Sequence, residues 1–323
     1  MSEIPALEIL SSVGYFTDLH ARSDTPEQRI DNFKESLLAK LHEIGEIFIK
    51  EGVHFVAFGG DLSHTPDPAY SLANPLMREL KSWNIPIVGV VGSHDYFGYQ
   101  KVTIDRTVLG NLVSAGVITL VDDDTYYKSQ DGKVIVVGNR HQYDSVDHPE
   151  RLNMPRIDES VPLQLQLVHC DLFNQSVPWP HILIQDVNTQ SDIVLSGHIH
   201  SGWEEPIKIN NTTFFNPGSI ARLEKSKTPR TPRVVIIELW SDGSVKIRSV
   251  YLKTALPHPF KDDVSEFKSE EVTSQDIDKL VEFIETSTIE MSDIKGLLRE
   301  FAKKEGFSES SVEITFELLD KVQ

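Results

Sequence analysis

The 323-residue sequence contains a single cysteine, Cys170, and has no run of about 18 apolar residues. One cysteine excludes an intramolecular disulfide and is compatible with a reducing compartment. Without a long apolar run, no segment is expected to cross a membrane. The first five residues lack the basic and apolar regions of a secretory signal. We therefore expect a cytoplasmic protein that does not associate with membranes.

Basic residues are in deficit, with 31 Lys and Arg against 49 Asp and Glu and a formal net charge of −18. This balance argues against a general electrostatic hold on nucleic acid, which normally shows as a basic surface. The acidic excess is uneven, however, because residues 261–323 hold 17 acidic and 8 basic residues. A basic stretch also remains at Arg222, Lys225, Lys227, Arg230 and Arg233. Net charge thus weakens the case for nucleic acid without removing it.

The sequence also lacks a Gly-x-x-x-x-Gly-Lys-Ser/Thr loop, internal repeats and low-complexity tracts. Without that phosphate-binding loop, any dependence on ATP has to come from a partner. The apolar and charged fractions, 39% and 25%, are ordinary for a globular protein. The chain length suggests one large domain with an appendage.

Strand and helix patterns alternate in the first ninety or so residues. Apolar runs at 13–17, 53–57 and 85–91 are separated by segments with helical spacing at 30–50 and 69–83. The run at 85–91 is nearly all apolar, as expected of a strand that is covered on both faces. This alternation with short links indicates a layered α/β domain.

The second half of the chain is richer in strand patterns. Further strands are expected at 134–137, 163–168, 192–195, 212–215, 234–239 and 245–250. Residues 241–244 have the composition of a hairpin turn between the last two strands, and 143–160 reads as a polar surface loop. We predict an α/β fold in which two mixed sheets form a sandwich flanked by helices.

The pattern changes beyond residue 255. Residues 256–270 contain two prolines followed by acidic residues, and are predicted to link the domain of residues 1–255 to a module at 271–323. Three short helical patterns occupy this module. It either docks on its own domain or presents an apolar stripe to a coiled coil. The linker and the separate charge balance favour the second interpretation.

Residues with metal-ligand chemistry follow five of the predicted strands. They are Asp18 and His20, Asp61, Ser93 with His94 and Asp95, His169, and His198 with His200. Residues i and i+2 of an extended chain point the same way, so Asp18/His20 and His198/His200 can each face one cavity. Sites in open α/β sheets form beyond the carboxyl ends of strands. The pattern predicts one site, whose mixed nitrogen and oxygen ligands suit Mn²⁺, Fe or Zn²⁺ better than Mg²⁺ or Ca²⁺.

These motifs, Asp-x-His, Gly-Asp, Gly-x-His-Asp, a lone His and Gly-His-x-His, resemble in this order the calcineurin-like metallophosphoesterase superfamily. The resemblance covers about residues 10–255 and implies a two-metal hydrolase. Metal one would be held by Asp18, His20, Asp61 and His200, and metal two by Asp61, Ser93, His169 and His198. His94 would lie beside the phosphate, stabilising the transition state or protonating the leaving oxygen. The family's usual Asn ligand is Ser93 here, so metal two is expected to bind weakly or to keep a water.

Within the superfamily, the sequence is most similar to SbcD-type DNA repair nucleases, including phage-type members. Residues 60–64, Gly-Asp-Leu-Ser-His, and residues 216–222, Asn-Pro-Gly-Ser-Ile-Ala-Arg, carry this likeness. The resemblance implies a DNA exo/endonuclease subunit with two divalent ions, Mn²⁺ foremost, that binds a coiled-coil ATPase of SbcC type through residues 271–323. Little sequence separates Tyr251 from the tail, so the usual DNA-capping domain is expected to be reduced or absent. Whether the subunit forms a homodimer is left open.

Further roles accompany this resemblance. His64 is assigned, with His94, to catalysis or DNA contact, against the alternative of a loop histidine facing solvent. Asp95 is grouped with the catalytic residues and is expected to orient His94 or to hold backbone rather than to bind metal. The residues assigned to DNA phosphates, against the alternative of a solvated loop, are Arg222, Lys225 and Lys227.

Two other functions fit the same residues. The 216–222 motif also occurs in small-substrate phosphodiesterases, so a stand-alone small-molecule phosphodiesterase or phosphatase is the first. The second is a weakly active scaffold or regulatory subunit, because Ser93 would weaken metal two. A closed pocket and no need for the tail would indicate the small-molecule enzyme. Inactivity with intact complex formation would indicate the scaffold.

Overall fold

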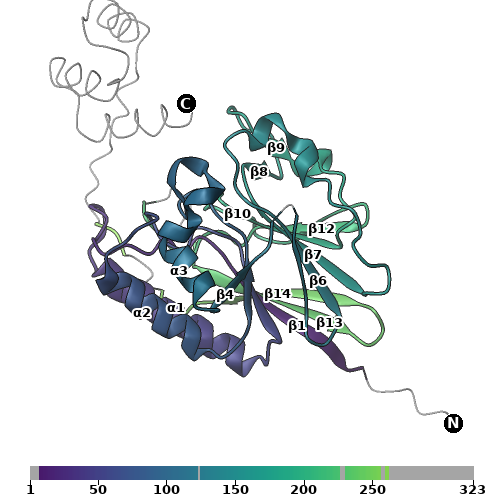
Figure 1. Ribbon diagram of the computed structural model, residues 1–323, viewed down its shortest axis with the longest axis horizontal. Coiled ribbons are helices and arrows are strands. Elements are labelled where there is room, and N and C mark those ends of the chain that lie inside the picture. Colours follow the sequence, from purple (N-terminus) through teal and green to yellow (C-terminus); the bar gives the residue numbers. More distant parts are fainter. Residues whose placement is uncertain (1–6, 123, 226–229, 256–258, 262–323) are drawn as a thin grey trace, which may run out of the picture. The chain divides into compact units, whose positions relative to one another are not determined.

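The computed structural model describes residues 7–122, 124–225, 230–255 and 259–261. In this part of the chain, two six-stranded sheets pack face to face and helices lie outside them (Figure 1). The predicted two-sheet α/β sandwich is therefore confirmed. No helix among the described residues is long and apolar enough to cross a membrane.

The first sheet joins the N-terminal strands to the last two strands of the domain, in the order β14-β13-β1-β2-β3-β4. Its strands are β1 (Ile9–Phe16), β2 (Phe55–Phe58), β3 (Ile87–Gly89), β4 (Ile118–Leu120), β13 (Arg233–Trp240) and β14 (Val245–Tyr251). Strands β1 to β4 run parallel, whereas β13 and β14 pair antiparallel. The carboxyl ends of β1, β2 and β3 therefore share one edge of the sheet.

The second sheet has the order β11-β12-β10-β7-β6-β5, with parallel central strands and antiparallel edges. Its strands are β5 (Tyr126–Lys128), β6 (Val134–Asn139), β7 (Leu163–His169), β10 (Ile193–Gly197), β11 (Ile207–Ile209) and β12 (Thr212–Phe215). A separate pair is formed by β8 (Leu172–Phe173) and β9 (Ile182–Leu183). The carboxyl ends of β7 and β10 lie side by side, since Gly197 is in register with His169.

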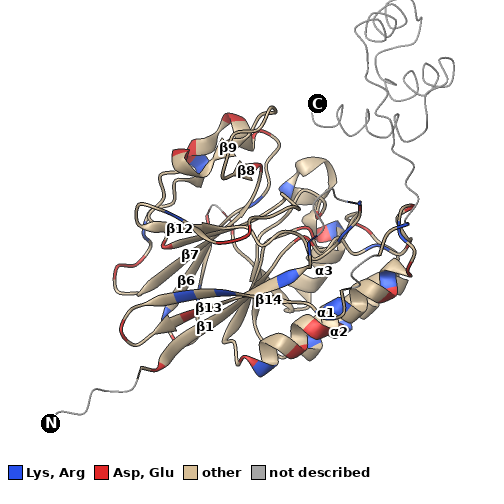
Figure 2. Ribbon diagram, turned by 180° about the vertical axis from the view of Figure 1, so that it is seen from behind, with Lys and Arg blue, Asp and Glu red and all other residues tan. Residues whose placement is uncertain are grey.

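Three α-helices, α1 (Phe33–Lys50), α2 (Tyr70–Ser82) and α3 (Val108–Ser114), pack on the first sheet. Helix α1 begins after Asn32, whose side chain accepts a hydrogen bond from the Glu35 amide. Its Phe48 lies so close to β1 that a Cβ on Gly14 would sit 2.5 Å from the ring, so a side chain at Gly14 would push the helix away. Charged residues lie along the outer surfaces of α1 and α2 (Figure 2).

Five short 3₁₀ helices complete the described structure. They are η1 (Phe97–Tyr99), η2 (Lys101–Arg106), η3 (Ser145–Asp147), η4 (Pro149–Leu152) and η5 (Ile184–Asp186). The η1 and η2 helices follow the end of β3, and η3 and η4 follow β6. These segments thus adjoin the edge at which the parallel strands end.

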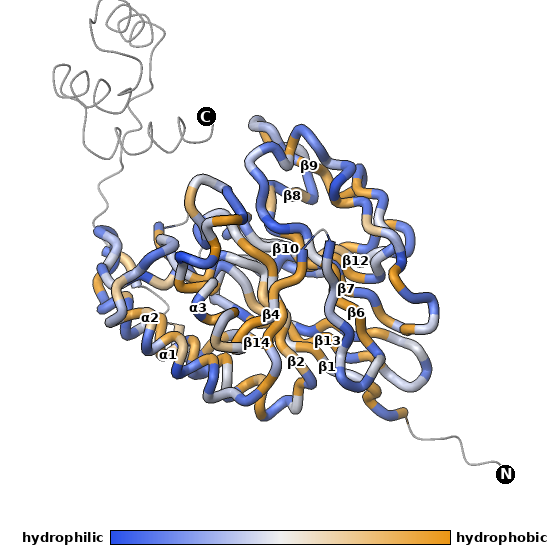
Figure 3. Tube along the Cα trace, in the orientation of Figure 1, coloured by the Kyte–Doolittle hydropathy of each residue, from blue (hydrophilic) through white to orange (hydrophobic). Residues whose placement is uncertain are grey.

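Apolar side chains fill two main layers. One lies between the sheets and includes Tyr15, Phe55 and Leu165, and the other joins the first sheet to the helices through residues such as Leu37 and Phe48. Strands through the middle of the domain are apolar, and hydrophilic residues concentrate in the loops and on the periphery (Figure 3). Burial of this apolar surface is the main favourable contribution to folding.

The long predicted elements are all present, but several short ones were not predicted. These are α3, β4, β5, β8, β9 and β11, each too short to show a clear period. The predicted module at 271–323, and the predicted linker apart from residues 259–261, lie outside the described residues. Residues 259–261 pair with residues 28–30, where the Ile30 amide donates to Pro259 and the Lys261 amide to Gln28. Contacts of the first domain therefore continue past its predicted boundary at 255.

Candidate metal centre

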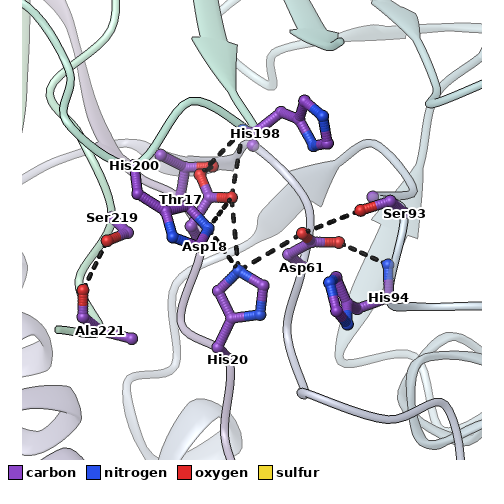
Figure 4. Close-up of polar contacts among 12 residues, drawn as sticks. Thr17, Asp18, His20, Asp61, Ser93, His94, His198, His200, Ser219 and Ala221 are labelled. Atoms are coloured by element: carbon purple, nitrogen blue, oxygen red, sulfur yellow. Dashed lines mark hydrogen bonds and ion pairs between the residues drawn. The ribbon is translucent and has the colours of Figure 1, made fainter. Parts of the chain in front are cut away.

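The residues predicted as metal ligands meet where parallel strands of both sheets end (Figure 4). Asp18 and His20 follow β1, Asp61 follows β2, His169 is the last residue of β7, and His198 and His200 follow β10. Residues distant in the sequence converge because the carboxyl ends of these parallel strands lie at one edge of the sandwich.

The predicted ligands form two groups, and within each group the nitrogen and oxygen atoms lie within 4.8 Å of one another; His20 also belongs to a third group of this kind, with His64 and His94. The first group is Asp18, His20 and His200, and the second is Asp61, His169 and His198. Asp61 lies between them, because its Oδ2 is 3.4 Å from His20 Nε2 and 3.2 Å from His169 Nε2. This position suits a carboxylate shared by two ions.

His169 shows that the second group is suited to a cation. Its Nδ1 donates to the Gly59 carbonyl at 2.7 Å, so Nε2 is the nitrogen that faces Asp61. That Nε2 is buried and has no hydrogen-bond partner among the described residues. Two buried electron-pair donors 3.2 Å apart need a positive charge between them, either a proton or a metal ion. The donor set therefore fits a divalent ion.

The pKa values of His169 and Asp61 reflect the same need for positive charge between them. Burial lowers the pKa of His169, but the Asp61 carboxylate outweighs burial and raises it to about 10. Burial raises the pKa of Asp61, but the positive charge of His169 outweighs burial and holds the pKa well below its usual value. Without metal, the pair thus keeps a proton, which a divalent ion would replace.

The first group has an equally close arrangement. His20 Nε2 and His200 Nε2 lie 2.8 Å apart, and each is 3.7 Å from Asp18 Oδ1. Burial lowers the pKa of His200 to about 4, so its ring is neutral at neutral pH and can act as a ligand. The Asp18 carboxylate accepts hydrogen bonds from Thr17 Oγ1 at 2.6 Å and the His198 amide at 3.1 Å. These bonds orient its oxygens toward the histidines (Figure 4).

The Asp18 carboxylate is ionised at neutral pH. Burial raises its pKa, but the adjacent His20, His169 and His200 outweigh burial and lower the pKa to about 2. An ionised carboxylate is the form that binds a divalent cation.

Four of the candidate ligands adopt left-handed backbone conformations. Their φ angles are 53° at Asp18, 43° at His20, 57° at Asp61 and 76° at His198. This region is unfavourable for residues with a Cβ, and Asp and His are among those that tolerate it best. Such strain persists where the surrounding structure holds the backbone in place, as it does at many functional sites.

Two glycines allow the strand ends to approach closely. A Cβ on Gly60 would lie 2.6 Å from His169 Nδ1, and Gly60 also has a φ of +96°. A Cβ on Gly92 would lie 2.2 Å from Asp61 Oδ1. The glycines of the Gly-Asp and Gly-x-His-Asp motifs are therefore required by the packing of the second group.

Asp95, predicted among the catalytic residues, supports the backbone. It is 1% exposed, and its carboxylate accepts hydrogen bonds at 2.8 Å from the amides of Asp61, Leu62 and Gly92. Burial, followed by the charge of Asp61, raises its pKa to about 6, so it is ionised at neutral pH. The structure thus places Asp95 behind Asp61, where it holds the turn rather than meets a substrate.

Ser93, predicted at the position of an amide ligand, contacts the shared carboxylate. Its hydroxyl donates to Asp61 Oδ2 at 3.3 Å (Figure 4). The second group of candidate ligands is formed without it. Three protein ligands leave coordination positions for water or substrate.

His94 and His64 stack beside the first group. Their ring centroids are 5.2 Å apart at 21°, and His94 is 4.8 Å from His20. The Nδ1 of His94 donates to the His64 carbonyl at 2.8 Å, which leaves Nε2 for another partner. Burial, then the proximity of His94, lowers the pKa of His64 to about 4, and burial likewise lowers that of His94. Both rings are therefore neutral at neutral pH in the absence of substrate.

Two of the three residues predicted to contact DNA, Arg222 and Lys225, lie among the described residues. Arg222 is half-buried, and its guanidinium contacts the Arg230 carbonyl. The exposed Lys225 donates from Nζ to the Lys261 carbonyl at 3.1 Å. Lys227 lies outside the described residues. Among the described residues, these contacts involve neighbouring loops rather than the candidate ligands.

The segment at 216–222 is hydrogen-bonded to the backbone that carries the first group of ligands. The Ile220 amide donates to the Thr17 carbonyl and the Ala221 amide to the Asp18 carbonyl, both at 3.2 Å. Ser219 Oγ in turn donates to the Ala221 carbonyl at 2.5 Å (Figure 4). This segment therefore fixes the backbone on which Asp18 is held.

Two residues beside the site were not among the predicted ligands or catalytic residues. Asp171 Oδ2 is 3.5 Å from His198 Nε2, and the buried His141 ring is 5.2 Å from that of His198. Asp171 lies two residues beyond the end of β7, so the strand-end signal used for the ligands could have found it. His141 follows β6 in the same way, beside Arg140.

Comparison with known proteins identifies the family. The model of the calcineurin-like phosphoesterase family matches residues 11–202, more than half of the chain. The chain therefore belongs to this family. Together with the two groups of candidate ligands, this assignment makes the protein a metal-dependent phosphoesterase. No curated protein matched the chain.

Several solved structures resemble the chain at low identity. A dimetal phosphatase from Danio rerio is 10% identical, with a TM-score of 0.47 over 76% of this chain and 100% of its own. The calcineurin-like phosphoesterase YfkN from Bacillus subtilis is 14% identical, with a TM-score of 0.48 over 76% and 90%. The phosphoesterase Yfce from E. coli is 15% identical, with a TM-score of 0.36 over 75% and 99%. The family assignment rests on the family model rather than on these likenesses.

Proposed function

We propose that the protein is a DNA exo/endonuclease subunit that hydrolyses phosphodiester bonds with two divalent ions, in a complex of SbcC/SbcD type. The observation that carries the proposal is the position of Asp61 between two groups of ligands, with His94 at the same strand ends. The Gly60–His64 and 216–222 motifs, which resemble those of SbcD-type nucleases, support DNA as the substrate. Mixed imidazole and carboxylate donors suit Mn²⁺.

The bound ions would supply positive charge to the phosphate and acidify the attacking water. Asp18, His20 and His200 would hold the first ion, and Asp61, His169 and His198 the second, with Asp61 shared. Asp95 and the 216–222 segment keep the carboxylates in place through the backbone. The chain thus presents a preorganised site that requires little rearrangement when substrate binds.

His94 is the residue that we assign to the leaving oxygen. Its Nδ1 is occupied by the His64 carbonyl, so Nε2 is the nitrogen that can bear a proton toward substrate. The ring is neutral in the free protein, because burial lowers its pKa. The negative charge of a bound phosphate would favour uptake of a proton on Nε2, which His94 could then donate.

The test is hydrolysis in Mn²⁺ of end-labelled duplex and single-stranded DNA, beside the small ester bis(p-nitrophenyl) phosphate. We expect short DNA products from the wild-type protein. His94→Asn should lower kcat by about 10²- to 10⁴-fold, the range of general acid–base catalysis, and should still bind two ions. Retained DNA cleavage in this variant would reassign the role of His94.

The competing function is a stand-alone small-molecule phosphodiesterase, and the same assay separates the two. Turnover of the small ester alone, with the ATPase subunit also present, would reject the nuclease. A scaffold role, suggested by Ser93 at the usual ligand position, would instead show complex formation without turnover of either substrate.

The tail at 271–323 is proposed to bind the coiled-coil ATPase. Deletion of residues 265–323 should leave metal binding and hydrolysis of the small ester intact and abolish association with the ATPase. Unimpaired association, measured by size-exclusion chromatography of the mixed subunits, would reject this assignment. The same experiment on the subunit alone shows whether it forms a homodimer.

A further inference from the structure

A row of rings leads from the second group of ligands to the protein surface. The centroids of His198 and His141 are 5.2 Å apart, those of His141 and Tyr99 5.1 Å, and those of Tyr99 and Tyr143 6.0 Å. Beyond His198, exposure rises outward from the buried His141, which is 8% exposed, through the half-buried Tyr99 to Tyr143, which is 44% exposed. The row therefore joins the candidate ligands to solvent through aromatic side chains.

The loops that carry these rings are held together. Tyr99 belongs to η1 and Tyr143 to the loop after β6, and the Tyr96 hydroxyl donates to the His141 carbonyl between them. Gly98 and Tyr99 both have left-handed backbone, with φ of 55° and 57°. A tyrosine adopts this conformation only where its surroundings impose it. Tyr99 is thus positioned in advance of any ligand, and Tyr143 lies against it.

The position of the row defines what it can bind. A ligand held by its phosphate at Asp61, His169 and His198 would extend its remaining part along the neighbouring rings. Aromatic faces favour a flat aromatic group, and a tyrosine offers such a face at little cost in side-chain entropy. The group that adjoins a phosphodiester and presents a flat ring is a nucleobase. A base can stack on protein side chains only when it is unstacked from its own strand.

We propose that Tyr99 and Tyr143 form a stacking platform for an unpaired nucleobase whose phosphate lies at the metal centre. This inference rests on the proposed phosphodiester hydrolysis and narrows its substrate to single-stranded or frayed ends. The platform accepts any base, because every base has an aromatic face. Its ligand could be a nucleotide within a strand or a free nucleotide, and the experiment separates these sources.

The experiment uses two matched pairs of ligands, each with and without a base. The first pair is a single-stranded thymidine oligonucleotide and the same strand with abasic tetrahydrofuran at its terminal nucleotides, compared by kcat/KM for cleavage in Mn²⁺. The second pair is thymidine 5′-phosphate and deoxyribose 5-phosphate, compared by calorimetric binding in Mn²⁺. We expect a preference for the base of roughly 5- to 100-fold, the range of base–aromatic stacking.

The double variant Tyr99→Leu/Tyr143→Leu should reduce this preference to about threefold or less, because leucine fills space without an aromatic face. If the tyrosines had a purely structural role, the variant would contain less folded protein. This loss would affect both ligands of a pair equally and would leave the ratio between them unchanged. Tyr70→Leu, an exposed tyrosine at the start of α2, is the matched control and should keep the wild-type ratio.

Each outcome decides the proposal. Equal values for both members of each pair, or an unchanged preference in the double variant, would overturn the platform. Cleavage of both strands without preference for the base would reject the platform and leave the nuclease intact. A preference for the base in the mononucleotide pair, with no cleavage of either strand, would keep the platform and reject DNA as the substrate.

Discussion

Two buried clusters of ionisable side chains lie in the described domain, and their charges are balanced differently. At the strand ends, Asp18 and Asp61 face histidines, so each carboxylate has a partner of opposite or variable charge. Beside α1, cations dominate. This second cluster is Arg29, Lys40, Arg222 and Arg230, with Asp31 bound to Arg29 as its acidic member.

Lys40 shows that burying cations in the second cluster is unfavourable. It is 0% exposed, and its Nζ has no hydrogen-bond partner among the described residues. Burial, then the nearby Arg29 and Arg222, lowers its pKa to about 7. At the strand ends, by contrast, bound cations would offset the cost of burying carboxylates. The comparison teaches that a buried charge alone does not mark a site, whereas donors that converge on one point do.

The largest effect should come from the carboxylate that serves both groups of ligands. Asp61→Asn should lower kcat by about 10³-fold or more, since the lost metal interactions contribute several kcal/mol. Asp18→Asn should affect mainly the first group, because the Asp18 oxygens lie 3.7 Å from His20 and His200 and touch the second group only through the His198 backbone amide, from which an Asn oxygen can also accept. Metal content by mass spectrometry should fall below one ion per chain in Asp61→Asn and to one in Asp18→Asn. Two ions retained in Asp61→Asn would contradict a shared ligand.

A second prediction concerns the close packing that distinguishes the site. Gly60→Ala should lower the free energy of unfolding by more than about 4 kcal/mol, because its Cβ would meet His169 and the backbone of Gly92. Gly52→Ala is the matched control, since Gly52 also has positive φ but nothing lies within 4 Å of a Cβ there. It should cost only about 1–2 kcal/mol. Equal urea midpoints for the two variants would refute the packing argument.

A third prediction concerns the cluster of cations around Lys40, where a substitution should stabilise the protein. Lys40→Met should raise the free energy of unfolding by about 1–3 kcal/mol at pH 7, because it removes a buried amine that lacks a hydrogen-bond partner. Lys50→Met, at the exposed end of α1, should change stability by less than about 0.5 kcal/mol. Urea unfolding measures both. A destabilised Lys40→Met would show that the amine has a favourable partner after all.

The sign of the pH dependence follows from the pKa of Lys40. Its value of about 7 in the folded protein lies below its ordinary 10.5, so the unfolded chain holds more protons between these values. The unfolding free energy contributed by Lys40 therefore rises with pH across this window and is lost as pH falls through about 7. The advantage of Lys40→Met should accordingly shrink as pH rises from 7 toward 10. A constant advantage would contradict the assigned cause.

The smallest effect should come from Ser93. Ser93→Asn would replace a hydroxyl that contacts Asp61 with an amide long enough to reach the second ion. We expect the affinity of the second ion to increase by up to about tenfold, with the first unchanged. A Mn²⁺ titration followed by calorimetry distinguishes the two ions. Unchanged or weaker binding of the second ion would show that Ser93 is not at a ligand position.

Much of the fold could be predicted because its long elements carry clear patterns. Helices α1 and α2 and strands such as β7 and β12 lie within a few residues of their predicted ranges. Strands of two or three residues, such as β4 and β8, were missed because pairing with neighbours rather than local periodicity defines them.

The candidate site could be predicted as a set, but individual roles could not. The convergence of Asp18, Asp61 and His169 follows from their places at the ends of parallel strands. The supporting role of Asp95, by contrast, depends on three backbone amides from two separate turns. The ring row through His141 and Tyr99 also depends on loops whose course no local pattern specifies.

By itself, the sequence determined the layered α/β class and the strand-end positions of the ligands. These follow from local periodicity and from backbone requirements, which are properties of short segments. Only the tertiary structure decided which ligands group together, that Asp61 lies between the groups, and that Lys40 is buried among cations. These depend on distances between segments far apart in the chain, which are fixed by the packing of the two sheets.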